Sequence, residues 1–311
     1  MEAWLVKLYY EGVDIASKIS INRCEHETFA ERKSDQLLLR FNDAAGLWNF
    51  WKPVRGEKVR LVDGADDTGV MYVTSIQPEN GLYTLRAMSM PLSGENVNSR
   101  SWEDVRLLQI GQDIATKHGL KFKVYNVTDR MYSYIKQERQ TDFEFLHRRC
   151  QLEGCAMLIY DGALIMYDEK QMEAAAAAAT IKIGADGCFT YFDDSAQSYG
   201  TAEIVSGNFR GTYSDANANT GRILRPKSAI ECTSSTEASR FARGLLRAAN
   251  KNTRTGHFRR CLTRGIAAAS VINIETEKAS GWNGKIFVTR TRHDFLTGET
   301  KVFFRKPLEG Y

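Results

Sequence analysis

The side chains of this 311-residue sequence that could bind a metal or move a proton are a histidine with two cysteines and one isolated histidine. His147, Cys150 and Cys155 follow one another as His-x-x-Cys-x4-Cys, but a zinc site needs a fourth ligand and usually has more closely spaced cysteines. His293 could act as a general base, yet no serine or cysteine nucleophile motif lies near it in the sequence. We therefore expect a structural hydrogen bond for His293 and no metal site at the cysteines.

Carboxylates are the third candidate for chemistry. Glu153 and the pair Asp193-Asp194 could serve a hydrolase, but no motif sets them at the separation that glycosidases use. A solvated turn is the better interpretation of the aspartate pair. The sequence thus predicts no catalytic residue, no cofactor and no metal.

Four cations recur along one predicted helix, residues 234–250, and could bind a partner. A capping box of Ser234 and Glu237 begins this helix, and its opposite face is apolar. The cations are Arg240, Arg243, Arg247 and Lys251. They could touch nucleic acid, an acidic protein neighbour or only water. No aromatic platform lies between them, which disfavours nucleic acid. We interpret them as a solvated or subunit-facing stripe and as candidate interface residues.

Composition is that of an ordinary globular chain. Apolar residues make up 43% and charged residues 26%, enough for well-formed cores. The net charge of +4 is too small to imply nucleic acid or a membrane surface as partner. The six cysteines are scattered, which favours free thiols over a disulfide framework. The sequence has neither a secretory signal at its start nor an apolar run long enough to span a membrane.

The elements that position these residues fall into four segments. Residues 1–91 alternate apolar and polar side chains between turn signals such as Asn80-Gly81, which predicts a first β domain, a sandwich or a barrel. Residues 92–170 mix helical and strand periods, so we expect a separate α+β module. Residues 171–180 include six consecutive alanines and suggest a short helical connector. Residues 181–311 return to β-strands and add the helix at 234–250. We expect the apolar face of this helix, around Phe241 and Leu245, to pack against its own barrel.

The two β regions resemble each other. The segment Gly69–Thr74 matches Gly284–Thr289, and a strand with alternating apolar residues precedes each copy, at Val59 and at Ile272. A hairpin with a glycine turn follows each copy, and both hairpins end in an arginine, Arg86 and Arg305. The repeat predicts two copies of one β-barrel with the α+β module between them.

Several stretches also resemble a known family. The first runs Thr-Asp-Phe-Glu-Phe-Leu from Thr141, and is followed by Gly154 and a hairpin at Asp161-Gly162. A second stretch is Trp102, which stands ahead of a predicted helix that ends near His118. The C-terminal match is 284–293, where a histidine closes the strand. Together they resemble the late control protein D family of tailed phages, the baseplate hub proteins, which are similar to the front half of type VI secretion spike proteins. The alanine-rich run at 265–270 departs from that family.

The resemblance implies a mainly β fold of two similar tube-type β-barrels flanking the α+β module. It also implies a homotrimer, a pseudo-sixfold ring that joins the hexameric tail tube to a separate central spike, with baseplate wedge proteins as further neighbours. DNA would pass through the lumen without specific binding. The expected location is the baseplate of a virion tail, contractile by family preference, after assembly in the host bacterial cytoplasm. A phage-derived injection particle stays open as the source. A tail-associated peptidoglycan hydrolase and a nucleic-acid-binding module are the alternative functions.

Overall fold

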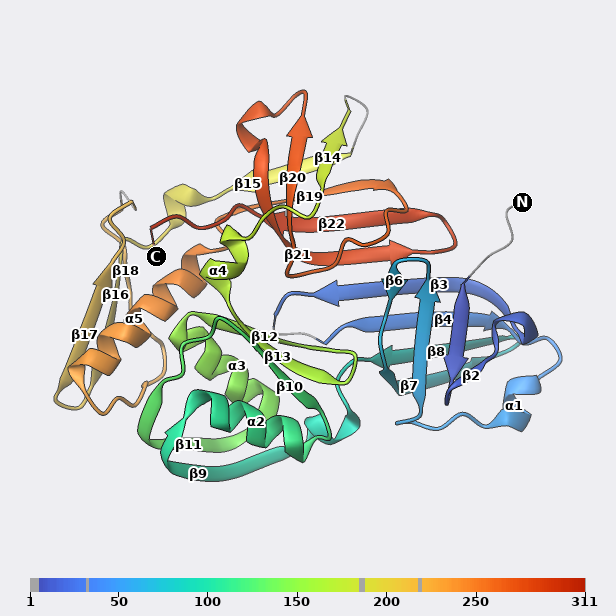
Figure 1. Cartoon of the computed structure of the whole chain (residues 1–311), viewed down its shortest axis with the longest axis horizontal. Helices are drawn as coiled ribbons and strands as arrows, with labels where there is room; N and C mark the ends of the chain where they lie inside the picture. The colour runs from blue at the N-terminus through green and yellow to red at the C-terminus, as the bar shows by residue number, and fades with distance from the viewer. Residues whose placement is uncertain (1–5, 32–33, 185–187, 218–219, 311) are drawn as a thin grey trace.

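The computed structural model describes residues 6–31, 34–184, 188–217 and 220–310, and residues 1–5 of the first predicted barrel lie outside this part. Antiparallel sheet dominates it, with a helix-containing module to one side (Figure 1). Strands of the N-terminal and C-terminal regions lie side by side, although the α+β module separates them in sequence. The mainly β fold that the sequence predicted is therefore confirmed.

The first barrel is built from strands whose apolar side chains alternate inward. Leu8, Leu39 and Leu61 are fully buried on its inner face, as alternation predicts. Its strands are β1 (Lys7–Tyr10), β2 (Val13–Asp14), β3 (Ser20–Phe29), β4 (Gln36–Asn42), β5 (Lys58–Asp63), β6 (Asp66–Asp67), β7 (Met71–Glu79) and β8 (Leu82–Met88).

The second barrel repeats this construction around another core. Phe258, Ile286 and Phe304 are buried at its centre. Its strands are β14 (Thr180–Ile183), β15 (Phe189–Asp193), β19 (Arg254–Cys261), β20 (Val271–Thr276), β21 (Gly284–Asp294) and β22 (Glu299–Arg305).

The predicted repeat is present in the strand pairing. The order β5-β7-β8-β4-β3 in the first barrel matches β20-β21-β22-β19-β15 in the second. Val59 pairs with Met71 as Ile272 pairs with Ile286. Each long strand also carries an irregularity at the same place, at Thr74 between β7 and β8 and at its counterpart in β21. Shared bulges at equivalent positions are typical of related domains, so the two barrels are copies of one design.

One detail of the predicted repeat is wrong. Tyr72 pairs with Met88, whereas its counterpart Phe287 pairs with Arg305. Met88 and not Arg86 is therefore equivalent to Arg305, because the second hairpin is two residues longer. The two arginines do not have a common role.

The barrels are joined edge to edge. β3 of the first barrel pairs antiparallel with β21 of the second, with Phe29 opposite Arg290 and Glu25 opposite Asp294. Among the described residues this pairing creates one sheet of 14 strands that runs through both barrels. Figure 1 shows the two strands lying next to each other at the centre of the molecule.

The α+β module contains the Thr141 motif. Thr141 Oγ1 accepts from the Glu144 amide at 3.2 Å and the Glu144 carboxylate accepts from the Thr141 amide at 3.0 Å, so the predicted capping box is confirmed. Gly154 ends the helix with a φ of 74°, which an L side chain rarely adopts. The module's elements are β9 (Val97–Arg106), α2 (Leu107–Lys117), β10 (Lys121–Tyr125), β11 (Met131–Thr141), α3 (Asp142–Glu153), β12 (Cys155–Tyr160) and β13 (Ala163–Asp168).

The helix predicted at 234–250 is α5 (Ser235–Asn250), but it packs elsewhere than expected. Phe241 and Leu246 share one hydrophobic core with Phe145 of α3, not with the second barrel. A Cβ at Gly244 would lie 2.2 Å from the Leu152 carbonyl oxygen, so only glycine permits this close approach of α5 to α3. Residues 181–311 therefore do not form one barrel, because the middle of this segment joins the α+β module.

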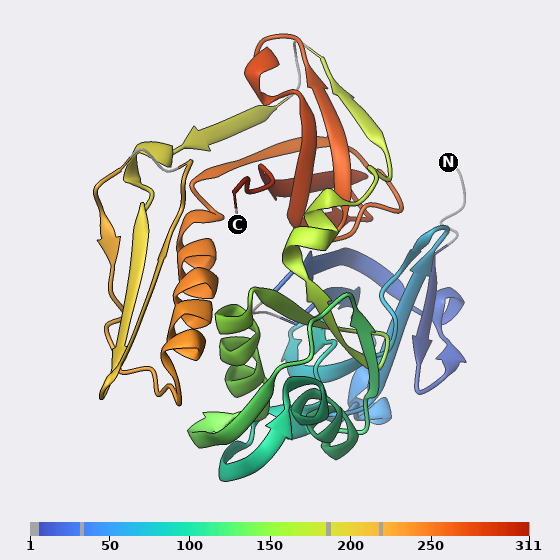
Figure 2. The same ribbon diagram turned by 60° about the vertical axis from the view of Figure 1, so that its left-hand side comes forward.

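A small sheet covers the other side of α5. It consists of β16 (Thr201–Ser206), β17 (Phe209–Ser214) and β18 (Ile223–Leu224). Figure 2 shows α5 between this sheet and α3. A helix with an apolar stripe is stable wherever another apolar surface covers it, and here the covering surface comes from the neighbouring module.

The six alanines at 174–179 do not form the helical connector that the sequence predicted. Helix α4 (Glu169–Ala174) stops at its first alanine, and the rest of the run is extended. The Ala178 amide donates to the Val271 carbonyl at 2.8 Å, and the Asn273 amide donates to the Ala179 carbonyl at 2.8 Å. Backbone pairing with β20 thus overrides the helix propensity of alanine.

Among the described residues, no helix combines the length and the apolar character that crossing a membrane requires.

Candidate partner-binding surfaces

Two of the four predicted interface cations are buried. Arg247 and Lys251 are each 4% exposed. Arg247 lies 3.1 Å from Glu169 and 2.6 Å from Glu173, the two glutamates of α4. Lys251 Nζ lies 2.6 Å from Glu169 and 2.6 Å from Glu31, which follows β3. The expectation of a solvated stripe is therefore wrong for these two residues, because carboxylates of this same chain surround them.

Arg305 of β22 completes the group. Its guanidinium pairs with Glu173 and lies 3.8 Å from Glu169. The Leu308 amide donates to the second oxygen of Glu173 at 2.9 Å. Burial alone would raise the pKa of Glu169, but Lys251 and its neighbouring arginines lower that pKa below its ordinary value. We call this group the central ion cluster; its members are Glu31, Glu169, Glu173, Arg247, Lys251 and Arg305.

The central ion cluster is balanced and joins distant segments. Three cations face three carboxylates, so the group carries no net charge. Its members come from the first barrel, the connector, α5 and the second barrel. A charged group inside a protein is tolerated when it is paired in this way. The cluster is thus a structural clamp at the meeting point of the modules.

The other two cations remain nearer the surface. Arg240 Nε lies 2.7 Å from Glu153 Oε2 and its side chain is partly exposed. Arg243 is exposed, with its guanidinium 5.6 Å from the centre of the Tyr213 ring. The interface prediction stays a prediction, and on exposure it falls mainly on Arg243.

The candidates for chemistry occupy structural positions. His293 is buried, with Nδ1 2.9 Å from Thr300 Oγ1 and Nε2 3.1 Å from the Ile266 carbonyl, so the predicted structural hydrogen bonds are present. A hydrogen bond with Cys150, together with burial, raises the pKa of the Cys155 thiol well above its ordinary value. No three His, Cys, Asp or Glu residues of the described ranges are placed to hold a metal ion.

The carboxylate candidates are likewise engaged. Asp193 accepts from the Ser195 amide and lies 3.1 Å from Arg254; it is exposed, as the sequence interpretation expected, but it ends strand β15 and does not lie in a turn. Glu153 accepts from the Tyr132 hydroxyl at 2.7 Å besides pairing with Arg240.

An apolar surface around α1 (Leu47–Trp51) was missed by sequence reasoning. Phe50 is 84% exposed and Trp51 42% exposed, with Leu47 exposed beside them. Trp48 of the same helix turns inward and stacks on Phe41, with ring centres 4.5 Å apart. The signal was the dense run Leu-Trp-Asn-Phe-Trp at 47–51, which is unusual for a connection between two strands.

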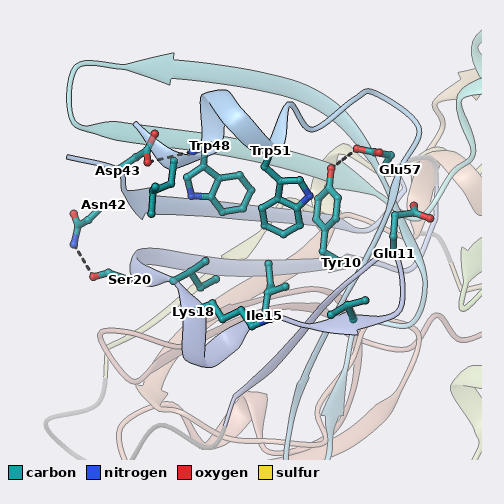
Figure 3. A pocket seen from close by; sticks show the side chains of 13 residues that line it. Tyr10, Glu11, Ile15, Lys18, Ser20, Asn42, Asp43, Trp48, Trp51 and Glu57 are labelled. Atoms are coloured by element: carbon teal, nitrogen blue, oxygen red, sulfur yellow. Dashed lines mark hydrogen bonds between the residues drawn. The ribbon is translucent and has the colours of Figure 1, made fainter. Parts of the chain in front are cut away.

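A cavity of about 770 Å³ lies beneath α1 (Figure 3). Figure 3 shows the rings of Trp48, Trp51 and Tyr10 lining it, with Ile15 opposite. The Tyr10 hydroxyl donates to Glu57 at 2.5 Å. Burial and this carboxylate raise the pKa of Tyr10, so the hydroxyl stays protonated and fixed. The cavity therefore has an apolar middle between two polar ends, Tyr10 with Glu57 at one and Asn42 with Ser20 at the other, and the middle suits an apolar side chain of a partner.

Two tube-type barrels in one sheet, with an α+β module inserted between them, are the architecture that the sequence predicted for hub proteins. The sequence model of the family described as phage tail baseplate hub (GPD) matches residues 62–298. Because that match covers most of the chain, the protein belongs to the phage tail baseplate hub family. Its class is thus a structural protein of the tail.

Solved structures with the same fold come from tails and from a secretion system. The 43 kDa tail protein of prophage MuSo2 from Shewanella oneidensis has a TM-score of 0.70 at 13% identity, covering 97% of this chain and 98% of that one. The tail protein from Neisseria meningitidis MC58 has a TM-score of 0.74 at 12% identity, covering 96% and 95%. The E. coli c3393 protein, a type VI secretion component, has a TM-score of 0.64 at 11% identity, covering 98% and 78%. The comparison with curated proteins gives no match.

Proposed function

We propose that the protein is a non-enzymatic hub that forms a homotrimeric ring and joins the tail tube to a separate central spike. The observation that supports this most is the duplicated barrel, with both copies held side by side in one continuous sheet. Three copies of such a chain present six similar barrels around one axis. A ring of that kind matches the symmetry of a hexameric tube, so one flat interface can serve all six positions.

In this proposal the protein acts through shape and interface area. DNA crosses the ring without specific binding, and the burial of Arg247 and Lys251 supports this, since both cations are already neutralised by carboxylates. The apolar side chains around α1 and the cavity beneath them are proposed to hold a neighbouring protein of the tail or baseplate, with wedge proteins as candidates. Arg240 and Arg243 are proposed as polar contacts to a neighbour. Assembly takes place in the host cytoplasm before incorporation into a contractile tail.

The first test is the mass of the purified protein, measured by light scattering coupled to gel filtration. A trimer near three times 35.1 kDa supports the ring, and negative-stain images should then show a central channel. A monomer that stays monomeric after addition of the tube and spike proteins of the same particle would overturn the proposal.

A further inference from the structure

The two barrels differ in which strand edges of the sheet have a hydrogen-bonded neighbour. In the second barrel, one edge of β21 is covered twice, by β20 along 284–287 and by β3 along 290–294. In the first barrel, the equivalent edge of β7 is covered by β5 at Met71 and Tyr72, and by the two residues that precede β5 at Val73. Within the part of the chain that the structure describes, nothing pairs with β7 on that side along 75–79.

A second unpaired edge belongs to β15. This strand is the counterpart of β3, and it pairs with β19 just as β3 pairs with β4. The other side of β3 is covered by β21, whereas that side of β15 is uncovered among the described residues. Tyr191 and Phe192 are 48% and 53% exposed there, which is unusual for aromatic side chains of a strand. The two free edges lie on opposite sides of the junction between the barrels.

We propose that a second copy of this chain supplies the missing neighbour, so that β15 of one chain pairs antiparallel with β7 of the next. The contact would copy the β3–β21 junction that already exists inside the chain. Because the two edges are different surfaces, the association is head to tail, and it closes into a ring when the rotation per subunit is right. This inference rests on the proposed ring and deepens it by naming the strands that meet.

The duplication also fixes the register. The repeat makes 75–79 equivalent to 290–294, and the pairing of β15 with β19 makes 190–193 equivalent to 25–28. Inside the chain Arg292 is opposite Glu27. Between chains the corresponding pair is Gln77 opposite Phe192. A shift of one residue would turn each side chain to the wrong face of the sheet, so the register is a sharp prediction.

The chemistry of the two junctions differs. Inside the chain Arg290 lies 2.6 Å from Glu27, and the Thr28 and Thr291 hydroxyls are 2.6 Å apart, so ions and hydroxyls seal that junction. Between chains, the face of the sheet that carries Tyr191 would bring an aromatic side chain against aliphatic ones. Tyr191 would lie opposite Pro78 and diagonal to Ile76, and such pairs stabilise neighbouring strands through contact area. Pro78 has no amide hydrogen, so the ladder there is at most one hydrogen bond shorter.

Disulfide trapping tests the register. The background carries Cys188→Ser and Cys261→Ser, which removes the two exposed native thiols. Adding Gln77→Cys and Phe192→Cys places two cysteines directly opposite each other, within the reach of a disulfide. The matched control pairs Gln77→Cys with Thr190→Cys, a diagonal position roughly 7–8 Å away. Mild oxidation followed by a non-reducing gel should give covalent dimers and trimers at least ten times more abundant for the in-register pair.

Two results separate this inference from the proposed ring. A trimer by light scattering in which the in-register pair does not cross-link above the control overturns the β7–β15 pairing and leaves the ring intact. A protein that is monomeric and does not cross-link, with tube and spike proteins present, overturns both.

A second variant measures the same contact without cysteines. Phe192→Asp should reduce the trimer fraction at least tenfold and leave the circular dichroism spectrum of the folded chain unchanged, because the side chain is exposed in the single chain. Val205→Asp, at an exposed position on β16, should leave the trimer unchanged. Equal trimer fractions for the two variants would contradict the pairing.

Discussion

Replacement of Glu173 by glutamine would test the central ion cluster. Glu173 accepts from Arg247 at 2.6 Å, from Arg305 and from the Leu308 amide. Glutamine keeps the size of the side chain and can still accept from the Leu308 amide. It removes one of three negative charges, so three buried cations face only two carboxylates. The change therefore isolates the charge from the packing.

The expected loss follows from burial. Removing one partner of a buried ion pair costs about 3–5 kcal/mol, because the remaining charge is left without compensation. Unfolding entropy of about 2.1 cal/mol/K per residue gives roughly 0.65 kcal/mol/K for a chain of this length. The melting temperature should accordingly fall by about 5–8 °C. The same estimate for an exposed pair is below about 1 kcal/mol.

Differential scanning calorimetry measures this difference directly. The matched control is Glu275→Gln, which removes one carboxylate from an exposed pair 3.9 Å from Lys182. The control should melt within about 1.5 °C of the wild type, since surface pairs contribute little. If Glu173→Gln also melted within that range, the cluster would not clamp the modules, and the burial argument would be refuted.

Three further outcomes are expected. Burial raises the pKa of Asp35 to about 7, so its protonated form stabilises the fold and this stability is lost as the pH rises from about 4 through 7. The side chain of Asp35→Asn cannot ionise. Chemical unfolding should therefore give the variant the same free energy of unfolding as the wild type near pH 4, and a higher one above pH 7 by on the order of 3–4 kcal/mol. Equal free energies of unfolding at pH 8 would contradict this. Gly244→Ala should lower stability by about 2 kcal/mol because its Cβ meets the carbonyl of α3, whereas Gly281→Ala, with open space around it, should change thermal stability by less than about 0.5 kcal/mol. A thiol reagent should modify two cysteines in the native protein and six after denaturation, and a third fast thiol would place a buried cysteine at the surface. The two exposed cysteines are Cys188 and Cys261.

Local signals predicted the elements well. The capping box at Thr141 and the glycine stop at Gly154 need only a few adjacent residues, and both have the predicted geometry. The repeat was also visible, because strands that serve the same place in two barrels keep the same alternation and the same turn. Such features depend on backbone preferences and on which face of a strand is buried, and sequence encodes both directly.

Choice of partner could not be predicted in the same way. The apolar face of α5 predicts that another element buries it. It does not predict that this element is α3 and not the second barrel. Periodicity placed Arg247 and Lys251 on a polar face, yet their glutamate partners lie far away in sequence. The alanines after Ala174 prefer helix in isolation and become extended because β20 offers them backbone partners. Each error concerns contacts that exist only after the modules meet.

The contrast between the two sheet junctions has a physical reason if β15 pairs with β7 as proposed. The junction inside the chain forms during folding, between strands that are always tethered, so partly buried ion pairs such as Arg290 with Glu27 can specify it. The free edges of β7 and β15 stay exposed to solvent until another copy of the chain binds. An exposed edge invites wrong pairing, and a proline or a charge on it reduces that risk. Pro78 and Glu79 lie on one free edge and Asp193 on the other, so each edge carries such a residue beside its apolar contacts. The same edges would then resist random aggregation and still accept a complementary copy, because a correct partner covers the aromatic rings that a misaligned strand leaves in water.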